Sequence, residues 1–252
     1  MTIYTTALGK GGSTKTTTAA EITAHLAARG RRVLAIDMDE QGNLTTRLGV
    51  LADMPVAAVA ADVILGTATA QQAAIPSPYL PSSIHAAGPG TDDLAELQHR
   101  PEAITALRDY LPSLTNRWDD VVIDTPPAMG IATLAALAAA DVIIAPVACE
   151  GEAYDQLERL DAIITGRINP RLRPGQRINW IIPTRANPQR CLDRDVLHTL
   201  HTHYPGRVTP AVREAVIVRD SYLDGKPVSC YAPGHPVTDD YHKALTPVLK
   251  EA

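Results

Sequence analysis

The chain has 252 residues, of which 45% are hydrophobic and 20% are charged, and its formal net charge is −5. This length and composition allow a sizeable buried core and exclude a globally disordered chain. The acidic balance excludes nucleic-acid binding through overall charge, so any such contact would need a local basic patch. The sequence contains neither a run of 18 apolar residues nor a signal-peptide pattern, and we expect no membrane span.

The first third of the chain predicts two buried strands separated by a helix. The strands are expected at residues 3–8 and 31–37, and the helix at residues 17–30. The stretch "LGKGGSTKTTTA" joins the first strand to this helix. Residues 50–82 are rich in alanine and indicate helix without clear boundaries, and residues 82–90 indicate a further strand and loop.

Three more strands are expected at residues 119–127, 141–148 and 178–184, and the stretch "GIATLAALAAA" between the first two of them predicts a helix. The apolar runs are continuous rather than alternating, which is typical of parallel strands covered on both faces. The expected fold class is therefore α/β, with a single doubly wound, mostly parallel sheet and helices on both faces. Because we find no internal repeat and no long linker, residues 1–252 are predicted to form one domain.

Residues 9–16 have the composition and the setting of a phosphate-binding loop. Glycines allow backbone N–H groups to turn inward around phosphate oxygens, and the start of the following helix adds partial positive charge. Lys15 is placed for the β- and γ-phosphates of a nucleotide, and the Thr16 hydroxyl is placed for Mg²⁺. The nucleotide contacts expected from this segment are Gly11, Gly12, Ser13, Thr14, Lys15, Thr16 and Thr17.

Carboxylates follow two of the predicted strands. Asp37 and Asp39 close the second strand, and Asp124 closes the third. Because the carboxyl ends of parallel strands lie on one edge of a sheet, these groups should share the edge that carries the loop. We expect Asp124 to hold Mg²⁺ directly or through water, and Asp39 to contact the ion through water and to orient or deprotonate an attacking water. For Asp37 we favour a structural, loop-capping role.

Several stretches resemble the ParA/MinD-type ATPases. "KGGSTKTT" resembles the deviant Walker A motif K-G-G-x-x-K-[ST], and "IDMDEQGNLTT" resembles the switch segment D-x-D-P-Q-G-N. "DDVVIDTPPAMG" looks like the Walker B and switch II segment of the family, and "VREAVIVRDSYLDGKPVSCYAPGHPVTDDYHKAL" looks like its carboxy-terminal region. The resemblance runs in order from residue 3 to about residue 248. It is greatest to the short plasmid- and chromosome-partition ParA proteins, which lack an N-terminal DNA-binding extension.

The resemblance implies a DNA partition ATPase that uses ATP or ADP and Mg²⁺. Such a protein would form an ATP-dependent sandwich homodimer, bind DNA without sequence preference, and hydrolyse ATP slowly under stimulation by a ParB-like centromere-binding partner. It would be cytoplasmic and nucleoid-associated, with no membrane partner. The resemblance also gives a role to Lys10, which would reach across the dimer to the partner's phosphates and act in catalysis with Lys15 and Asp39. Taken alone, Lys10 could equally be a solvated loop lysine.

Two residues depart from the family pattern. Thr14 stands where glycine is common, and a β-branched residue tolerates positive φ poorly, so we expect a negative φ at Thr14. A positive φ would mean a strained loop and weaker ATP binding. Glu40 replaces the usual proline of the switch segment, which adds charge and chain freedom beside Asp39 and bears on the hydrolysis rate.

By the same resemblance, adenine would contact residues 183–185, with Thr184 at their centre, and the turn at Thr209 and Pro210. Both segments could also simply be turns. DNA contacts require cationic side chains for the phosphates, although each could instead belong to a solvated charged face. The residues considered for DNA contact are Arg185, Arg190, Arg213, Arg219 and Lys226.

The sequence contains further features that bear on function, and other functions are compatible with the same fold. His198, His201 and His203 invite a metal site, but no further ligands complete one, so an exposed helix face is expected. The carboxy-terminal stretch "TDDYHKALTPVLKEA" is amphipathic and is expected to pack on the core rather than on a membrane. The main alternative function is a MinD-like or protein-cargo positioning ATPase. A ligase or iron–sulfur reductase on the same fold and a catalytically inactive nucleotide-dependent scaffold are further alternatives.

Overall fold

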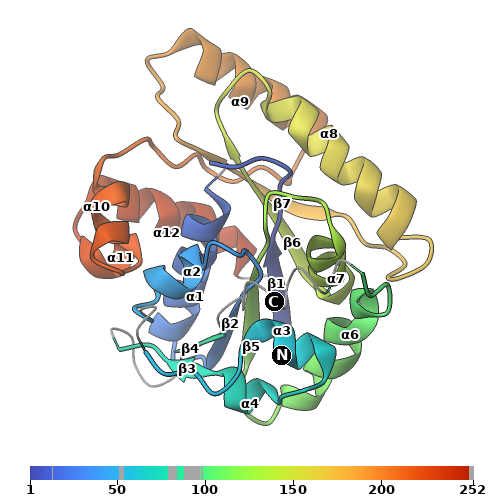
Figure 1. The fold of residues 1–252 in the computed structure, drawn as a ribbon. Helices are drawn as coiled ribbons and strands as arrows, with labels where there is room; N and C mark the ends of the chain where they lie inside the picture. Colours follow the sequence, from blue (N-terminus) through green and yellow to red (C-terminus); the bar gives the residue numbers. More distant parts are fainter. Residues whose placement is uncertain (13, 51–53, 79–83, 88–96, 98, 250–252) are drawn as a thin grey trace.

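A mostly parallel sheet forms the centre of the molecule (Figure 1). The computed structural model describes residues 1–12, 14–50, 54–78, 84–87, 97 and 99–249. Within these residues the sheet has seven strands in the order β3-β4-β2-β5-β1-β6-β7. All neighbours pair in parallel except β3 and β4. The strands are β1 (Thr2–Thr6), β2 (Val33–Asp37), β3 (Ile75–Pro76), β4 (Ile84–Ala87), β5 (Asp120–Asp124), β6 (Val142–Ala148) and β7 (Ile178–Thr184).

Helices connect these strands and cover both faces of the sheet. The α-helices are α1 (Lys15–Ala28), α2 (Asn43–Arg47), α3 (Ala60–Leu65), α4 (Ala70–Ala73), α6 (Ala103–Tyr110), α7 (Ile131–Ala139), α8 (Ala153–Ile163), α9 (Cys191–His203), α10 (Ile217–Leu223), α11 (Val228–Tyr231) and α12 (Pro236–Val248). A 3-10 turn at Leu111–Leu114 follows α6, and a π-helical turn at Ile164–Ile168 follows α8. The doubly wound α/β fold expected from the sequence is confirmed.

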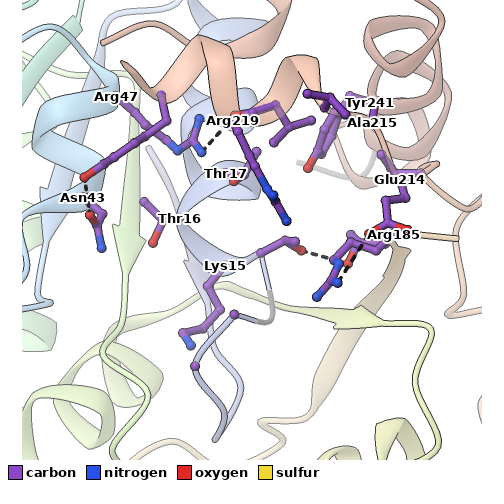
Figure 2. Close-up of a pocket in the computed structure, with 18 of the residues that line it drawn as sticks. Lys15, Thr16, Thr17, Asn43, Arg47, Arg185, Glu214, Ala215, Arg219 and Tyr241 are labelled. Atoms are coloured by element: carbon purple, nitrogen blue, oxygen red, sulfur yellow. Dashed lines mark hydrogen bonds and ion pairs between the residues drawn. The ribbon is translucent and has the colours of Figure 1, made fainter. Parts of the chain in front are cut away.

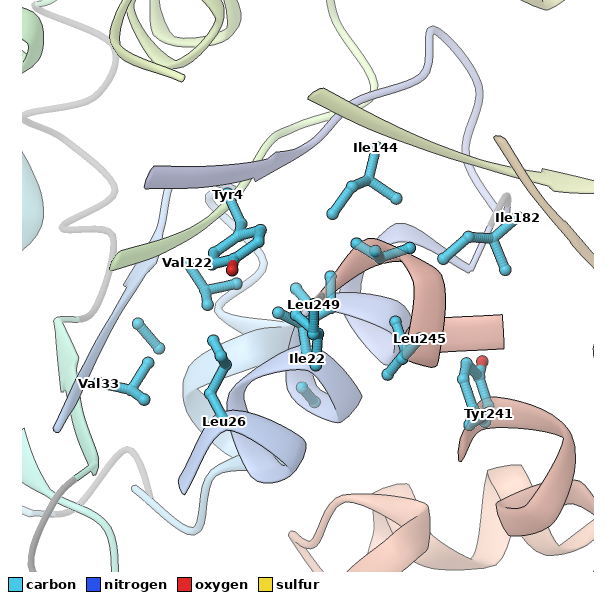
Figure 3. Close-up of a cluster of buried hydrophobic side chains, with 14 of the residues drawn as sticks. Tyr4, Ile22, Leu26, Val33, Val122, Ile144, Ile182, Tyr241, Leu245 and Leu249 are labelled. Atoms are coloured by element: carbon cyan, nitrogen blue, oxygen red, sulfur yellow. The ribbon is translucent and has the colours of Figure 1, made fainter. Parts of the chain in front are cut away.

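Alternate residues of the central strands β1, β2 and β5 point to opposite faces, which explains their continuous apolar runs. Tyr4, Val33 and Val122 pack with Ile22 and Leu26 of α1, and Figure 3 shows this cluster with the carboxy-terminal helix beside it. The neighbouring residues on the same strands, such as Leu34 and Val121, pack against α3, α6 and α7 on the other face. A strand buried on both sides has no polar face, so alternation disappears from its sequence.

The five main strands and the two helices predicted beside them are present, most with ends within a few residues of the prediction. The expectation of helix over residues 50–82 was only partly right. That region contains α3, α4 and the short strand β3, because Gly66 at φ 77° ends α3 and Thr69 caps a new start. The predicted strand near residue 84 is β4. Residues 51–53, 79–83 and 88–90 of these two predictions lie outside the described residues.

The carboxy-terminal helix α12 contributes to the core, as predicted. Its apolar side, including Leu245 and Val248, is buried in the cluster of Figure 3 against α1 and the sheet. Pro236 occupies the first turn of the helix, where its missing N–H costs nothing. The apolar side of the carboxy-terminal segment, up to Leu249, is therefore buried against the core. No helix within the described ranges is both long and apolar enough to cross a membrane.

Candidate nucleotide-binding site

The glycine-rich loop lies between β1 and the first turn of α1, as the motif requires. The Thr18 N–H donates to the Thr14 carbonyl across 2.9 Å and closes the first helical turn. Lys15 is only 6% exposed, and its Nζ donates to the Lys10 carbonyl oxygen at 3.0 Å. Burial lowers the pKa of the Lys15 ammonium, while the Asp124 and Asp39 carboxylates oppose this shift. The loop thus places a partly desolvated cation at the start of a helix. Ser13 lies outside the described residues.

The expectation of a negative φ at Thr14 was wrong. Thr14 has φ 66° and ψ 16°, which is the left-handed region. The loop has to reverse direction just before α1, so this position demands the conformation that glycine adopts freely, whatever residue occupies it. A left-handed non-glycine residue costs roughly 1–2 kcal/mol. The Thr14 hydroxyl donates to Thr184 Oγ1 at 2.8 Å, and this bond to the end of β7 offsets part of the strain.

Asp124 lies at the base of the site, directly behind Thr16. The Thr16 hydroxyl donates to Asp124 Oδ2 at 2.6 Å, and the Thr6 hydroxyl donates to Asp124 Oδ1 at 2.9 Å. Burial and the neighbouring charge of Asp37 raise the pKa of Asp124. Hydroxyl and carboxylate oxygens so close together, with Asp39 bordering the same cavity, suit a hard divalent cation.

The residues after β2 divide into a structural and an accessible carboxylate. Asp37 is buried and accepts hydrogen bonds from the Thr45 N–H and hydroxyl at 2.9 and 3.0 Å, in agreement with its expected loop-capping role. Burial raises the pKa of Asp37. Asp39 is half-buried, borders the cavity and accepts from the Gln41 N–H at 3.1 Å. Glu40 is exposed beside it.

A cavity of about 670 Å³ extends from the loop to the segment before α10 (Figure 2). The predicted nucleotide and metal contacts that line it are Gly11, Gly12, Thr14, Lys15, Thr16, Thr17, Asp39 and Thr184. Lys10, Asp124 and Pro210 are not among the lining residues. Asp124 is covered by Thr16, and Pro210 is exposed outside the cavity.

Sequence reasoning missed the far end of this cavity. Its wall is formed by residues 212–216, Val218 and Tyr241. The apolar members of this wall, such as Val212, Val216 and Val218, suit a nucleobase. The only sequence signal was the apolar pattern within "VREAVIV", which equally fits a buried strand. The wall depends on how the segment before α10 folds back over β7, where the Val212 N–H donates to the Pro183 carbonyl at 2.8 Å.

Side chains on α2 join the cavity wall to α10. The Tyr222 hydroxyl donates to Asn43 Oδ1 at 2.7 Å, and the Arg47 guanidinium carbon lies 5.0 Å from the centre of the Tyr222 ring. Arg47 Nη1 and Nη2 also lie 3.4 Å from Ser221 Oγ and from the Val218 carbonyl. The segment after Asp39 and the helix over the cavity are therefore held together.

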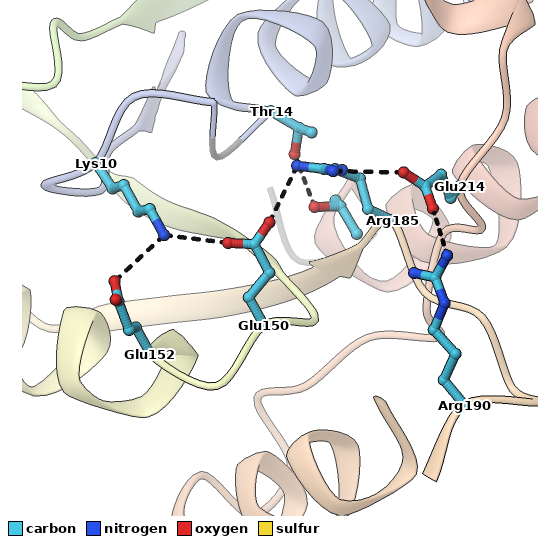
Figure 4. A network of polar contacts seen from close by, with 8 residues as sticks. Lys10, Thr14, Glu150, Glu152, Arg185, Arg190 and Glu214 are labelled. Atoms are coloured by element: carbon cyan, nitrogen blue, oxygen red, sulfur yellow. Dashed lines mark hydrogen bonds and ion pairs between the residues drawn. The ribbon is translucent and has the colours of Figure 1, made fainter. Parts of the chain in front are cut away.

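Lys10 is not among the residues that line the cavity, and its side chain is directed toward two glutamates (Figure 4). Its Nζ pairs with Glu150 at 3.1 Å and with Glu152 at 3.3 Å, at the start of α8. The hydrogen bond that Lys10 donates to Glu150 is the main reason why the pKa of Lys10 is raised. The two lysines of the loop thus have different environments: Lys15 is buried in the loop, and Lys10 lies at the rim between two carboxylates.

The five residues considered for DNA contact do not gather into one free basic patch. Four of them are paired with carboxylates: Arg185 with Glu150 and Glu214, Arg190 with Glu214, Arg213 with Asp240, and Lys226 with Asp224. Arg219 belongs to the cavity lining, as do Arg185 and Arg213. The three histidines lie on α9 with exposed side chains, and the described residues hold no cluster that could bind a metal ion through them. The exposed helix face expected there is confirmed.

Comparison with known proteins agrees with this geometry. A family model described as an AAA domain matches residues 1–173. The chromosome partitioning protein ParA of Caulobacter vibrioides is 33% identical over 232 residues, which cover 88% of this chain and 84% of that protein. The complex of a Cyanothece McdA variant with ATP superimposes with a TM-score of 0.85 at 22% identity, over 98% of this chain and 96% of McdA.

A further solved structure is the cobyrinic acid a,c-diamide synthase of Mycobacterium smegmatis with a bound ATP analogue and magnesium. Its TM-score is 0.75 at 28% identity, over 92% of this chain and 94% of that one. The family model and the ParA relative each extend over more than two thirds of the chain, and the family model's match, residues 1–173, includes the loop, the carboxylates and the strands that carry them. The chain therefore belongs to the ParA/MinD-type family of P-loop ATPases.

Proposed function

We propose that this protein is a DNA partition ATPase that binds Mg-ATP in the cavity over the glycine-rich loop. The carrying observation is the convergence of Lys15, Thr16, Asp39 and Asp124 from the ends of three adjacent strands. These four groups supply a cation for the phosphates, two oxygens for Mg²⁺ and a carboxylate that can orient water. Such convergence is what phosphoryl transfer to water requires.

Each group has a separate part in the proposed reaction. Thr16 and Asp124 would hold Mg²⁺, which neutralises charge on the β- and γ-phosphates when it is bound. Lys15, which burial has partly desolvated, would interact strongly with the same phosphates because water competes little with it. Asp39 is half-exposed and would orient the attacking water. A nucleobase would occupy the apolar end of the cavity near Val212.

Lys10 supports the proposal that two chains close face to face. Its ammonium lies outside the lining of its own cavity, at the rim, where carboxylates hold it. A partner chain placed on that rim would bring its phosphates toward Lys10, which would then leave Glu150 and Glu152. ATP binding and dimerisation would be coupled through this lysine. Non-specific DNA and a ParB-like stimulating protein are the partners proposed for the dimer.

The burial of the apolar side of α12 favours DNA over a membrane as the surface on which the dimer acts. A MinD-like positioning role would need an apolar surface that can enter lipid. Retention of the ATP-bound protein on DNA at low salt, measured beside flotation with anionic vesicles, separates the two functions. Flotation without DNA retention would replace partition with membrane positioning.

The site itself is tested by phosphate release from ATP with Mg²⁺. Lys15→Ala should reduce turnover by at least about 100-fold, because it removes a preorganised charge at the transferred phosphoryl group. Lys243→Ala, an exposed lysine on α12, is the matched control and should keep full turnover. Full turnover by Lys15→Ala would refute the assignment of the site.

A further inference from the structure

Arg219 differs from the other cations that line the cavity. Lys15 and Arg47 are buried, with hydrogen bonds to the Lys10 and Val218 carbonyls, whereas Arg185 and Arg213 are paired with carboxylates. Arg219 is exposed and, within the described part of the chain, forms no ion pair. Figure 2 shows its side chain extending from α10 into the cavity, past Thr17 and toward the start of α1.

The cavity holds few carboxylates that could neutralise Arg219. The acidic residues of the lining are Asp39 and Glu214. Glu214 already accepts from Arg185 at 3.4 Å and from Arg190 at 3.3 Å, and Asp39 follows β2 at the magnesium end of the site. A guanidinium stays charged at any working pH and carries five donors in a planar fork that matches phosphate oxygens. Such a group, open on one side to the cavity, suits an anionic ligand.

The helix that carries Arg219 is fixed relative to the nucleotide site. Arg47 lies within hydrogen-bonding distance of the Val218 carbonyl, one residue before Arg219, and Tyr222 is bonded to Asn43 one turn later. These contacts hold α10 against α2, whose chain leads directly from Asp39. The backbone that carries Arg219 is thus already fixed, so α10 loses little conformational freedom when Arg219 binds a ligand.

We propose that Arg219 binds the phosphates of the nucleotide, reaching them from α10. This replaces its expected role as a DNA contact, and it rests on the proposed ATP-binding function. Lys15 and Mg²⁺ would act on the phosphates from the loop and the sheet edge. Arg219 would add charge-assisted hydrogen bonds from α10, and so would favour polyphosphates over nucleosides.

The test measures ATP, ADP and adenosine binding by calorimetry, with Mg²⁺, for wild type, Arg219→Ala and Arg219→Lys. The matched control is Arg159→Ala, an exposed arginine on α8 outside the cavity lining. Loss of charge-assisted hydrogen bonds should weaken ATP and ADP binding by about 10- to 100-fold in Arg219→Ala. Adenosine binding should stay unchanged. Arg219→Lys, which keeps the charge without the planar fork, should lie between wild type and Arg219→Ala.

Three outcomes would overturn the proposal. Unchanged ATP affinity in Arg219→Ala refutes it, and a simultaneous loss of DNA retention at saturating ATP would return Arg219 to the DNA surface. An equal loss of ATP and adenosine binding would make Arg219 a residue that shapes the cavity. If neither wild type nor Arg159→Ala binds ATP, both the proposed function and this inference fail. If wild type and Arg219→Ala bind ATP equally tightly, only this inference fails.

Discussion

The left-handed conformation of Thr14 can be tested by comparing two substitutions that both remove its hydroxyl. In Thr14→Ala and Thr14→Gly the bond to Thr184 Oγ1 is lost equally, so it cancels from their difference. At φ 66° alanine retains a strain of roughly 1–2 kcal/mol that glycine does not have. Glycine lowers the free energy of unfolding by roughly 0.4–1 kcal/mol because it makes the unfolded chain more flexible. Thr14→Gly should therefore be more stable than Thr14→Ala by about 1 kcal/mol.

Thermal and urea unfolding of the nucleotide-free protein measure this difference. For a chain of this size, about 1 kcal/mol corresponds to about 2–4 °C in Tm. Thr14→Ser, which keeps a hydroxyl, should exceed Thr14→Ala by about 0.5–1.5 kcal/mol if the bond to Thr184 is formed. The sign of the glycine–alanine difference is decisive. At a negative φ alanine would be the more stable of the two, and that result would refute the strained loop.

Three further predictions address Lys10, the buried carboxylates and α12. Glu150→Gln with Glu152→Gln removes the charges that hold Lys10, so the double variant should dimerise at lower ATP concentration in light scattering; an unchanged concentration would show that these pairs do not restrain Lys10. Burial raises the pKa of Asp124 above 3.8, so the folded protein binds this proton more tightly than the unfolded chain does. The free energy of unfolding without Mg²⁺ should therefore fall as pH rises above about 4, and Asp124→Asn should make this fall smaller. Equal pH dependence in wild type and Asp124→Asn would contradict the pKa shift. Leu245→Ala should lower the free energy of unfolding in urea by about 2–5 kcal/mol because Leu245 is fully buried. Leu223→Ala, at a site 84% exposed, should change it by less than about 0.5 kcal/mol. Equal effects of the two substitutions would contradict the packing of α12.

Thr14 also illustrates the limit of residue-based reasoning about conformation. The β-branched side chain argues for a negative φ, but the backbone path from β1 to α1 outweighs that preference. Strain of this kind persists where the surrounding structure determines the conformation, and such positions cluster at functional sites. The family's common glycine was the better indicator, since it reports on the loop rather than on the residue found there.

The sequence by itself determined the strand cores, the glycine-rich loop and the carboxylates that close the strands. These features are local: a run such as "VVID" is buried on both faces, and the residues at its end must lie at one edge of the sheet. Tertiary structure alone decided the pairing of Arg185 with Glu150 and the opening of Arg219 into the cavity, because these depend on how α10 and the segment after β7 fold back. Charge on a side chain can be read from the sequence, but whether that charge is already neutralised depends on partners that lie far away along the chain.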